Sequence, residues 1–134
     1  MLTVHVCSFS FKRGLPEDPT GHGGGFVFDC RALPNPFWDE ALRPFTGCDQ
    51  PVIDFFAQVP EKVEPFLNAA ESLVRQTIDE YLVDGRTHLQ VAFGCTGGQH
   101  RSVYFAERLA AQLRTHPNIH VTLTPSAKAF WKNF

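Results

Sequence analysis

The sequence has no closely spaced cysteines, no long apolar run and no signal-like start, and each absence excludes a class of protein. Its four cysteines, Cys7, Cys30, Cys48 and Cys95, are far apart. No C-x-x-C zinc or redox motif is therefore present, and we interpret the cysteines as reduced thiols. No apolar stretch approaches the ~18 residues that span a bilayer, and Met1 is not followed by the charged and apolar regions of a signal peptide. We expect a cytoplasmic protein without a metal centre.

Basic residues are also too few to give the chain a positive field. Lys and Arg number 12 against 14 Asp and Glu, the formal charge is -2 and the isoelectric point is about 6.3. A phosphate backbone is bound by concentrated positive charge, so the composition does not suggest a nucleic-acid ligand, and only a local basic patch would change this. At 134 residues, with no internal repeat and no linker, we expect a single domain over residues 1–134.

The patterns that are present alternate between strands and helices. Strands are predicted over residues 2–8, 26–30, 88–93 and 119–123, and helices over 51–57, from 60 or 65 to 83, and over 101–115. The continuous apolar run at 26–30 is typical of a strand buried on both faces. Residues 9–25 are rich in glycine and proline and predict a loop, and the prolines in 33–38 exclude regular structure there. The alternation predicts an α/β fold with a mostly parallel sheet and helices packed on it.

One turn carries more chemistry than packing requires. The segment GCTGGQHRS, residues 94–102, joins a predicted strand to a predicted helix. Backbone N–H groups of a glycine-rich turn and of a helix N-terminus form a concave site for anions. Arg101 adds a planar fork that suits two phosphate oxygens, and Thr96 and Ser102 add hydroxyl donors. We expect a phosphate monoester or another oxyanion here, while His100 is either a ligand contact or a structural residue.

The same turn is open to a second interpretation. Cys95, Arg101 and Ser102 fit C-x5-R-[ST], which looks like the phosphate loop of cysteine phosphatases, with Cys95 as nucleophile and Arg101 holding the phosphoryl oxygens. That loop carries a histidine directly before the cysteine, and this sequence has Gly94. A general acid is also needed, and nothing in the sequence chooses between Asp29 and Asp49. Cys95 is alternatively a small buried residue of the turn.

Four segments resemble, in this order, the C-terminal domain of the RapZ family. They are SFSFKRGLP at 8–16, VFDCRALPNP at 27–36, LRPFTG at 42–47 and GCTGGQHRSV at 94–103. The resemblance extends from about residue 3 to residue 124. It implies a domain like an α/β subdomain of phosphofructokinase, which binds glucosamine-6-phosphate and also serves in RNA binding and oligomerisation. The family's N-terminal nucleotide-binding domain has no counterpart, because the sequence contains no G-x4-G-K-[ST].

The resemblance also implies site residues. Asp29 is then the acid of the pocket, and the phosphate side consists of Cys95, Thr96, Gly97, Gly98, His100 and Arg101. The chain departs from the family at Phe37, where enterobacterial members have a ligand-contacting histidine, which affects sugar specificity. It also departs in the tail, residues 126–134, which has only two lysines instead of a dense basic terminus, so RNA binding is expected to be weak.

These observations lead to a ranked set of hypotheses. The first is a non-catalytic sensor that binds a phosphorylated amino sugar or a related phosphate metabolite without a cofactor. A cysteine-dependent phosphatase and an RNA-binding adaptor are the alternatives, and a protein partner or a homo-oligomer fits any of the three. Basic residues at strand ends and in loops either clamp the ligand or make local salt bridges; they are Lys12, Arg13, Arg31 and Arg43.

Overall fold

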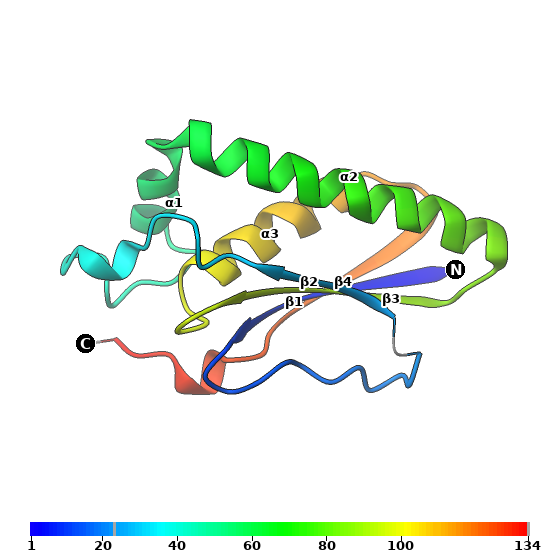
Figure 1. The fold of residues 1–134 in the computed structure, drawn as a ribbon, viewed down its shortest axis with the longest axis horizontal. Coiled ribbons are helices and arrows are strands. Elements are labelled where there is room, and N and C mark those ends of the chain that lie inside the picture. The colour runs from blue at the N-terminus through cyan, green and yellow to red at the C-terminus, as the bar shows by residue number, and fades with distance from the viewer. Residues whose placement is uncertain (23, 134) are drawn as a thin grey trace.

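The fold is described here from a computed structural model, which covers residues 1–22 and 24–133. The α-helices lie on one side of the sheet (Figure 1). The elements follow in the order β1 (Leu2–Ser10), β2 (Gly25–Asp29), a 3-10 turn η1 (Pro36–Trp38), α1 (Gln50–Ala57), α2 (Pro60–Asp84), β3 (His88–Cys95), α3 (Arg101–Leu113), β4 (Ile119–Pro125) and a second 3-10 turn η2 (Lys128–Phe130). Residue 23, within the glycine-rich loop expected before β2, lies outside the described residues.

The sheet is parallel throughout, with the strand order β2-β3-β1-β4. β1 and β3 are the central strands and run side by side from Thr3 opposite His88 to Ser10 opposite Cys95. All four strands therefore end at one edge, which lies on the left in Figure 1. The predicted α/β fold with a parallel sheet and packed helices is confirmed.

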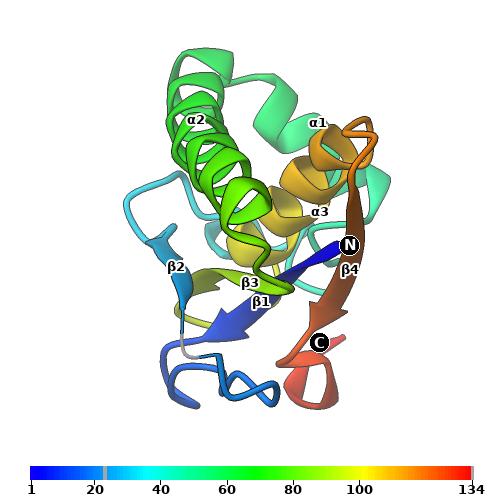
Figure 2. The same ribbon diagram turned by 90° about the vertical axis from the view of Figure 1, so that its right-hand side faces the viewer.

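The main core lies between the sheet and the helices. Side chains alternate across a strand, and Leu2, Val4 and Val6 of β1 accordingly point toward the helices. α2 contributes a stripe with helical spacing, from Val63 to Ile78, and α3 is buried along most of its length. Figure 2 shows α2 and α3 next to each other above the strands. Packing of this core fixes where the strand ends and the start of α3 meet.

The opposite face of the sheet has a much smaller apolar cluster, formed by Cys7, Phe9 and Ala92 with Phe11 against them. β2 lies at the edge of the sheet, and Val27 on it is 52% exposed. The prediction that this strand is buried on both faces was wrong. One face of β2 packs against the helices, and the apolar side chains on its other face are partly exposed to solvent.

The proline-rich segment after β2 also differs from expectation. Residues 36–38 form the 3-10 turn η1, and the Asn35 side chain caps it by accepting a hydrogen bond of 3.1 Å from the Phe37 N–H. Proline at the first position of such a turn loses no hydrogen bond, since that N–H has no partner within a helix. The exclusion of regular structure over residues 33–38 was therefore wrong for this single turn. Among the described residues, no helix has the length and apolar character needed to cross a membrane.

Candidate anion-binding site

In the turn between β3 and α3, most backbone carbonyl groups accept hydrogen bonds from other segments, whereas the backbone N–H groups donate none within the described residues. The carbonyl groups of Cys95, Thr96, Gly98 and Gln99 accept hydrogen bonds, at 2.6 to 3.0 Å, from Phe11 N–H, Ser10 Oγ, Trp131 Nε1 and Gly47 N–H respectively. The N–H groups of residues 96–100 donate to no other group in the described part of the chain. Gly98, Gln99 and His100 are buried, where backbone donors normally have a partner, and Thr96 and Gly97 are exposed. All five N–H groups are thus free of protein partners and can be offered to a ligand.

Neighbouring segments hold the turn in this orientation. Gly98 has a φ of 66°, in the left-handed region that favours glycine. Arg101 begins α3, a helix of 13 residues, and the positive end of its dipole adds to the field of the turn. The arrangement is the one expected of a site for a phosphate or carboxylate.

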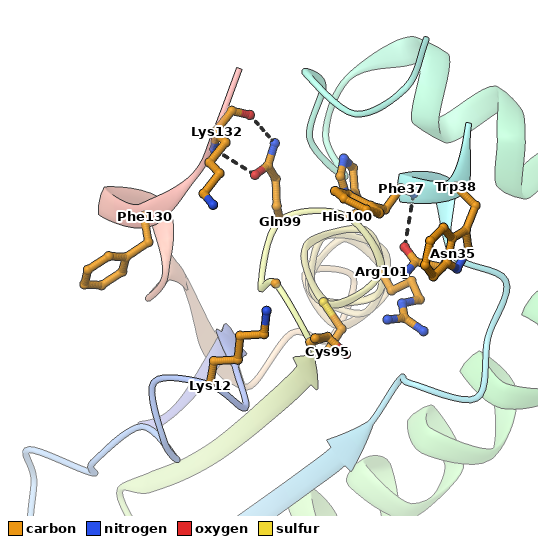
Figure 3. Close-up of a pocket in the computed structure, with 12 residues that line it drawn as sticks. Lys12, Asn35, Phe37, Trp38, Cys95, Gln99, His100, Arg101, Phe130 and Lys132 are labelled. Atoms are coloured by element: carbon orange, nitrogen blue, oxygen red, sulfur yellow. Dashed lines mark hydrogen bonds between the residues drawn. The ribbon is translucent and has the colours of Figure 1, made fainter. Parts of the chain in front are cut away.

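A cavity of about 380 Å³ opens beside this turn. Figure 3 shows side chains reaching it from four separate parts of the chain. They are Lys12 after β1; Asn35, Phe37 and Trp38 around η1; Cys95, Thr96, Gly97, Gln99, His100 and Arg101 of the turn; and Phe130 and Lys132 after β4. Three of these residues are cationic and none is Asp or Glu. A chain with a net charge of -2 thus has a cavity lined only by positive charge.

The two lysines come from opposite sides of the cavity. In Figure 3 the side chains of Lys12 and Lys132 point toward each other beside the turn. Neither ammonium group forms an ion pair with a carboxylate among the described residues. Both are therefore available to an anion that also meets the backbone N–H groups of the turn.

Arg101 lies on the other side of Cys95 and is only 5% exposed. Its Nη1 donates to the carbonyl oxygens of Arg31 at 2.7 Å and Leu33 at 3.2 Å, while its buried Nε has no hydrogen-bond partner among the described residues. The predicted phosphate fork is thus partly used to hold the segment after β2. A charged side chain that is buried, lines a cavity and has an unpaired nitrogen is a second indication of an anionic ligand.

His100 occupies the position just before α3 and is 7% exposed. Burial lowers the pKa of its imidazole, and the nearby carbonyl groups of Arg43, Leu42 and Phe45 partly oppose this effect. Its buried Nε2 makes no hydrogen bond with a described residue. The ring is therefore held mainly neutral near pH 7, and it faces the cavity beside Phe37 (Figure 3).

Cys95 and Ser102 form a buried pair beneath the turn. The Cys95 thiol donates to Ser102 Oγ at 3.1 Å, and the Ser102 N–H donates to the sulfur at 3.4 Å. Ser102 is fully buried and does not line the cavity, so it acts on Cys95 and not directly on a ligand. A Cβ atom on Gly94 would lie 2.4 Å from the ring of Phe9, so the turn has no room for the histidine of a phosphatase loop.

Several predicted site residues lie outside the cavity lining. Asp29 pairs with Arg31 at 2.7 Å, and the hydrogen bonds from Arg31 lower the pKa of its carboxyl group. The Arg31 guanidinium also lies over the Phe11 ring.

The other basic candidates have contacts of their own. Arg13 lies 3.8 Å from the centre of the Phe130 ring, and Arg43 donates to the Phe37 carbonyl group at 2.7 Å. Gly98 and Asp49 are not lining residues either. Of the four clamp candidates, only Lys12 reaches the cavity.

Sequence reasoning did not select five lining residues, namely Asn35, Trp38, Gln99, Phe130 and Lys132. Gln99 is within the glycine-rich turn and could have been nominated from its place in the motif. Asn35 and Trp38 follow a strand end, which is a usable signal. Phe130 and Lys132 come from a segment without periodicity, and only tertiary packing brings them to the cavity. No group of three or more His, Cys, Asp or Glu side chains suited to a metal ion lies within residues 1–22 and 24–133.

Known proteins that are similar in sequence to this chain match most of its length. A nucleotide-binding protein of Ralstonia nicotianae is 48% identical over 120 residues, which cover 90% of this chain and 38% of that protein. Another, from Cupriavidus taiwanensis, is 47% identical over 128 residues, or 93% of this chain and 42% of that protein. A third, from Burkholderia thailandensis, is 49% identical over 114 residues, or 85% and 36%. The chain thus spans about two fifths of the length of these relatives.

The matched part of those relatives corresponds to a defined family. The family model described as the RapZ C-terminal domain matches residues 2–125. This range contains all four strands, the helices and the turn at 96–100, and it ends just before the segment that brings Phe130 and Lys132 to the cavity. The chain belongs to the RapZ C-terminal domain family.

Proposed function

We propose that this domain is a non-catalytic sensor that binds a phosphorylated sugar, or a related phosphate metabolite, in the cavity beside the 96–100 turn. The observation that carries this proposal is the charge of the lining. Lys12, Arg101 and Lys132 surround backbone N–H groups that have no partner within the described chain, and no carboxylate lies among the lining residues. A phosphate monoester supplies the acceptor oxygens and the negative charge that such a site requires.

The rest of the lining suits the sugar part of the ligand. Asn35 and Gln99 offer amide groups, and Phe37, Trp38 and Phe130 offer aromatic faces, a combination common in small-molecule sites. The family resemblance suggests an amino-sugar phosphate. The ammonium group of such a ligand has no carboxylate partner among the lining residues, so we expect the phosphate to supply most of the binding free energy and the amino group little.

The relatives are named nucleotide-binding proteins, and this chain matches about two fifths of each of them. A phosphate-binding loop of the G-x4-G-K-[ST] type is absent from the present sequence. We infer that any nucleotide site corresponding to that name lies in the part of those proteins that this chain does not match.

Thermal unfolding in the presence of candidate ligands tests the proposal. We expect glucosamine-6-phosphate and glucose-6-phosphate to stabilise the domain, and glucosamine, which lacks the phosphate, to have no effect. A ligand present at 100 times its Kd stabilises the native state by ~2.7 kcal/mol, which gives a readily measured shift in Tm. The proposal fails if no phosphorylated compound raises the Tm, or if glucosamine alone does so equally.

A matched pair of variants at Gly97 tests the location of the site. A Cβ atom on Gly97 has no atom within 4 Å, so a side chain fits there without disturbing the fold. Gly97→Asp and Gly97→Asn add side chains of nearly equal size that differ in charge. Repulsion between unit charges 4 Å apart is ~1 kcal/mol in water and ~4 kcal/mol near a protein surface, so we expect the Asp variant to bind at least ~5-fold more weakly than the Asn variant. Equal affinities, measured by calorimetry, would place the anion elsewhere.

A further inference from the structure

The segment from residue 126 to residue 132, here called the strap, is fastened directly to the anion-binding turn. The Trp131 indole N–H donates to the Gly98 carbonyl group at 2.7 Å. Gln99 donates to the Lys132 carbonyl group at 2.7 Å and accepts from the Lys132 N–H at 2.9 Å. One side-chain amide thus pairs with the backbone of Lys132 as a neighbouring strand would.

Gln99 also connects the strap to a second segment. Its Nε2 lies within hydrogen-bond distance of the carbonyl groups of Phe45, at 3.0 Å, and Arg43, at 3.3 Å. The side chain is 6% exposed although it joins two surface segments. The strap is therefore attached by polar contacts to the same turn that borders the cavity.

The strap also brings charge to the cavity. Phe130 and Lys132 line the cavity, whereas Lys128, in η2, does not. Lys132 faces Lys12, which belongs to the loop after β1 and is far away in the sequence (Figure 3). Two ammonium groups that converge without a carboxylate repel each other and weaken the docking of the strap. An anion between them reverses the sign of this interaction.

We propose that Lys12 and Lys132 form a two-sided phosphate clamp, so that an anion bound at the turn fastens the strap and the strap reports whether the cavity is occupied. The inference rests on the proposed function, since it concerns the same cavity. It assigns the phosphate of the ligand to the turn with its two lysines and leaves the sugar facing Asn35 and Trp38.

Hydrogen–deuterium exchange of the strap, with inorganic phosphate and glucose-6-phosphate as probes, tests the clamp. The amide of Lys132, which donates to Gln99, is among those expected to respond. When the probe saturates the site, we expect hydrogen–deuterium exchange of the 126–132 peptide to slow ~5-fold or more. A factor of ~5 is the lower end of the coupling typically found between two sites in a protein. Thermal stabilisation by the same probes is measured in parallel. If no probe stabilises the domain, the proposed function and the clamp both fail; stabilisation without slower strap exchange overturns the clamp alone.

Two lysines of the strap provide the matched comparison. We expect Lys132→Ala to bind both probes ~10-fold more weakly and to lose the ligand-dependent protection, because one side of the clamp is missing. Lys128→Ala removes the same charge from the same strap and should behave as the wild type, since Lys128 does not line the cavity. Lys12→Ala, on the opposite side, should repeat the effect of Lys132→Ala. Equal loss of binding in the Lys128 and Lys132 variants would reduce the clamp to a general effect of charge and overturn it.

Discussion

The Cys95 thiol is held in place by Ser102, and the lining residues of the cavity include no carboxyl group that could protonate a leaving group. Ser102 binds the sulfur from below, and the cavity lining has no Asp or Glu. Asp29 is paired with Arg31, and Asp49 accepts a hydrogen bond of 2.7 Å from the Thr46 N–H. Cleavage of a phosphate ester by a cysteine needs both a nucleophile and an acid.

Phosphomonoester turnover dependent on Cys95 is therefore not expected. A chromogenic phosphate ester incubated with the wild type and with Cys95→Ser should release product at the same background rate in both. Cys95→Ser keeps a small polar side chain beside Ser102 and so should retain the fold. Activity that disappears only in the Cys95 variant would establish the phosphatase instead of the sensor.

His100 makes the stability of the domain dependent on pH. Burial lowers its folded-state pKa below the ordinary value of 6.5, so the unfolded chain binds a proton more readily than the native state. Stability from this group is complete above about pH 6.5 and is lost as the pH falls toward the folded-state pKa. The cause is the cost of placing an imidazolium in a buried position next to Arg101.

The corresponding measurement is urea unfolding at about pH 7.5 and pH 5.5, in buffers without phosphate, for the wild type and for His100→Gln. The wild type should lose more unfolding free energy between the two pH values than the variant, because glutamine does not titrate. Parallel losses in the two proteins would assign the pH dependence to other groups. Phosphate is omitted because a bound anion would favour the protonated ring.

At the scale of elements, periodic segments could be predicted well. The helix predicted over residues 101–115 has apolar residues at helical spacing, and all of them are buried in α3; they are Val103, Ala106, Leu109, Ala110 and Leu113. The predicted strands and helices are all present, with ends shifted by a few residues. Hydrophobic spacing indicates these elements because each must bury one face, and this requirement is local in the sequence.

Features set by neighbouring strands or by distant contacts could not be predicted in the same way. The apolar run of β2 has the same appearance whether the strand is central or at an edge, and its place beside β3 leaves Val27 half-exposed. The contact of Gln99 with Lys132 joins residues 33 positions apart. Residues 126–132 have no hydrophobic periodicity from which this contact could be predicted. The turn at 94–102 could be identified because its glycines, the start of the helix and Arg101 are adjacent in the sequence. The residues that the strap contributes to the cavity are brought there only by tertiary packing.

At the scale of the whole molecule, half of the positive charge, six of the twelve Lys and Arg side chains, is already paired or buried. Five arginines form ion pairs with acidic side chains, and Arg101 is buried; the five are Arg31, Arg43, Arg75, Arg86 and Arg108. Six cationic side chains remain, and none forms an ion pair with a described carboxylate. Lys62 on α2 and Arg114 after α3 are two of them, and the other four, Lys12, Arg13, Lys128 and Lys132, lie on the two segments that border the cavity. The basic surface near the cavity is thus small, and half of it belongs to the proposed clamp.

This charge distribution predicts weak binding of RNA. Affinity for a nucleic-acid backbone comes from cations that neutralise phosphates and release counterions. For single strands, the logarithm of the binding constant falls with the logarithm of the salt concentration with a slope of ~0.7 per phosphate contact. The four cations beside the cavity give a slope of ~3, and we expect a dissociation constant no tighter than the ~10⁻⁶ M of nonspecific binding at physiological salt. Titration of a structured RNA at several salt concentrations measures both quantities, and the Lys12→Ala, Lys132→Ala double variant should lower the slope by ~1.4. Because the same lysines are expected to hold a sugar phosphate, glucose-6-phosphate should compete with the RNA. Nanomolar binding, with a slope well above 3, would show instead that the domain presents a larger basic surface and acts as an RNA-binding adaptor.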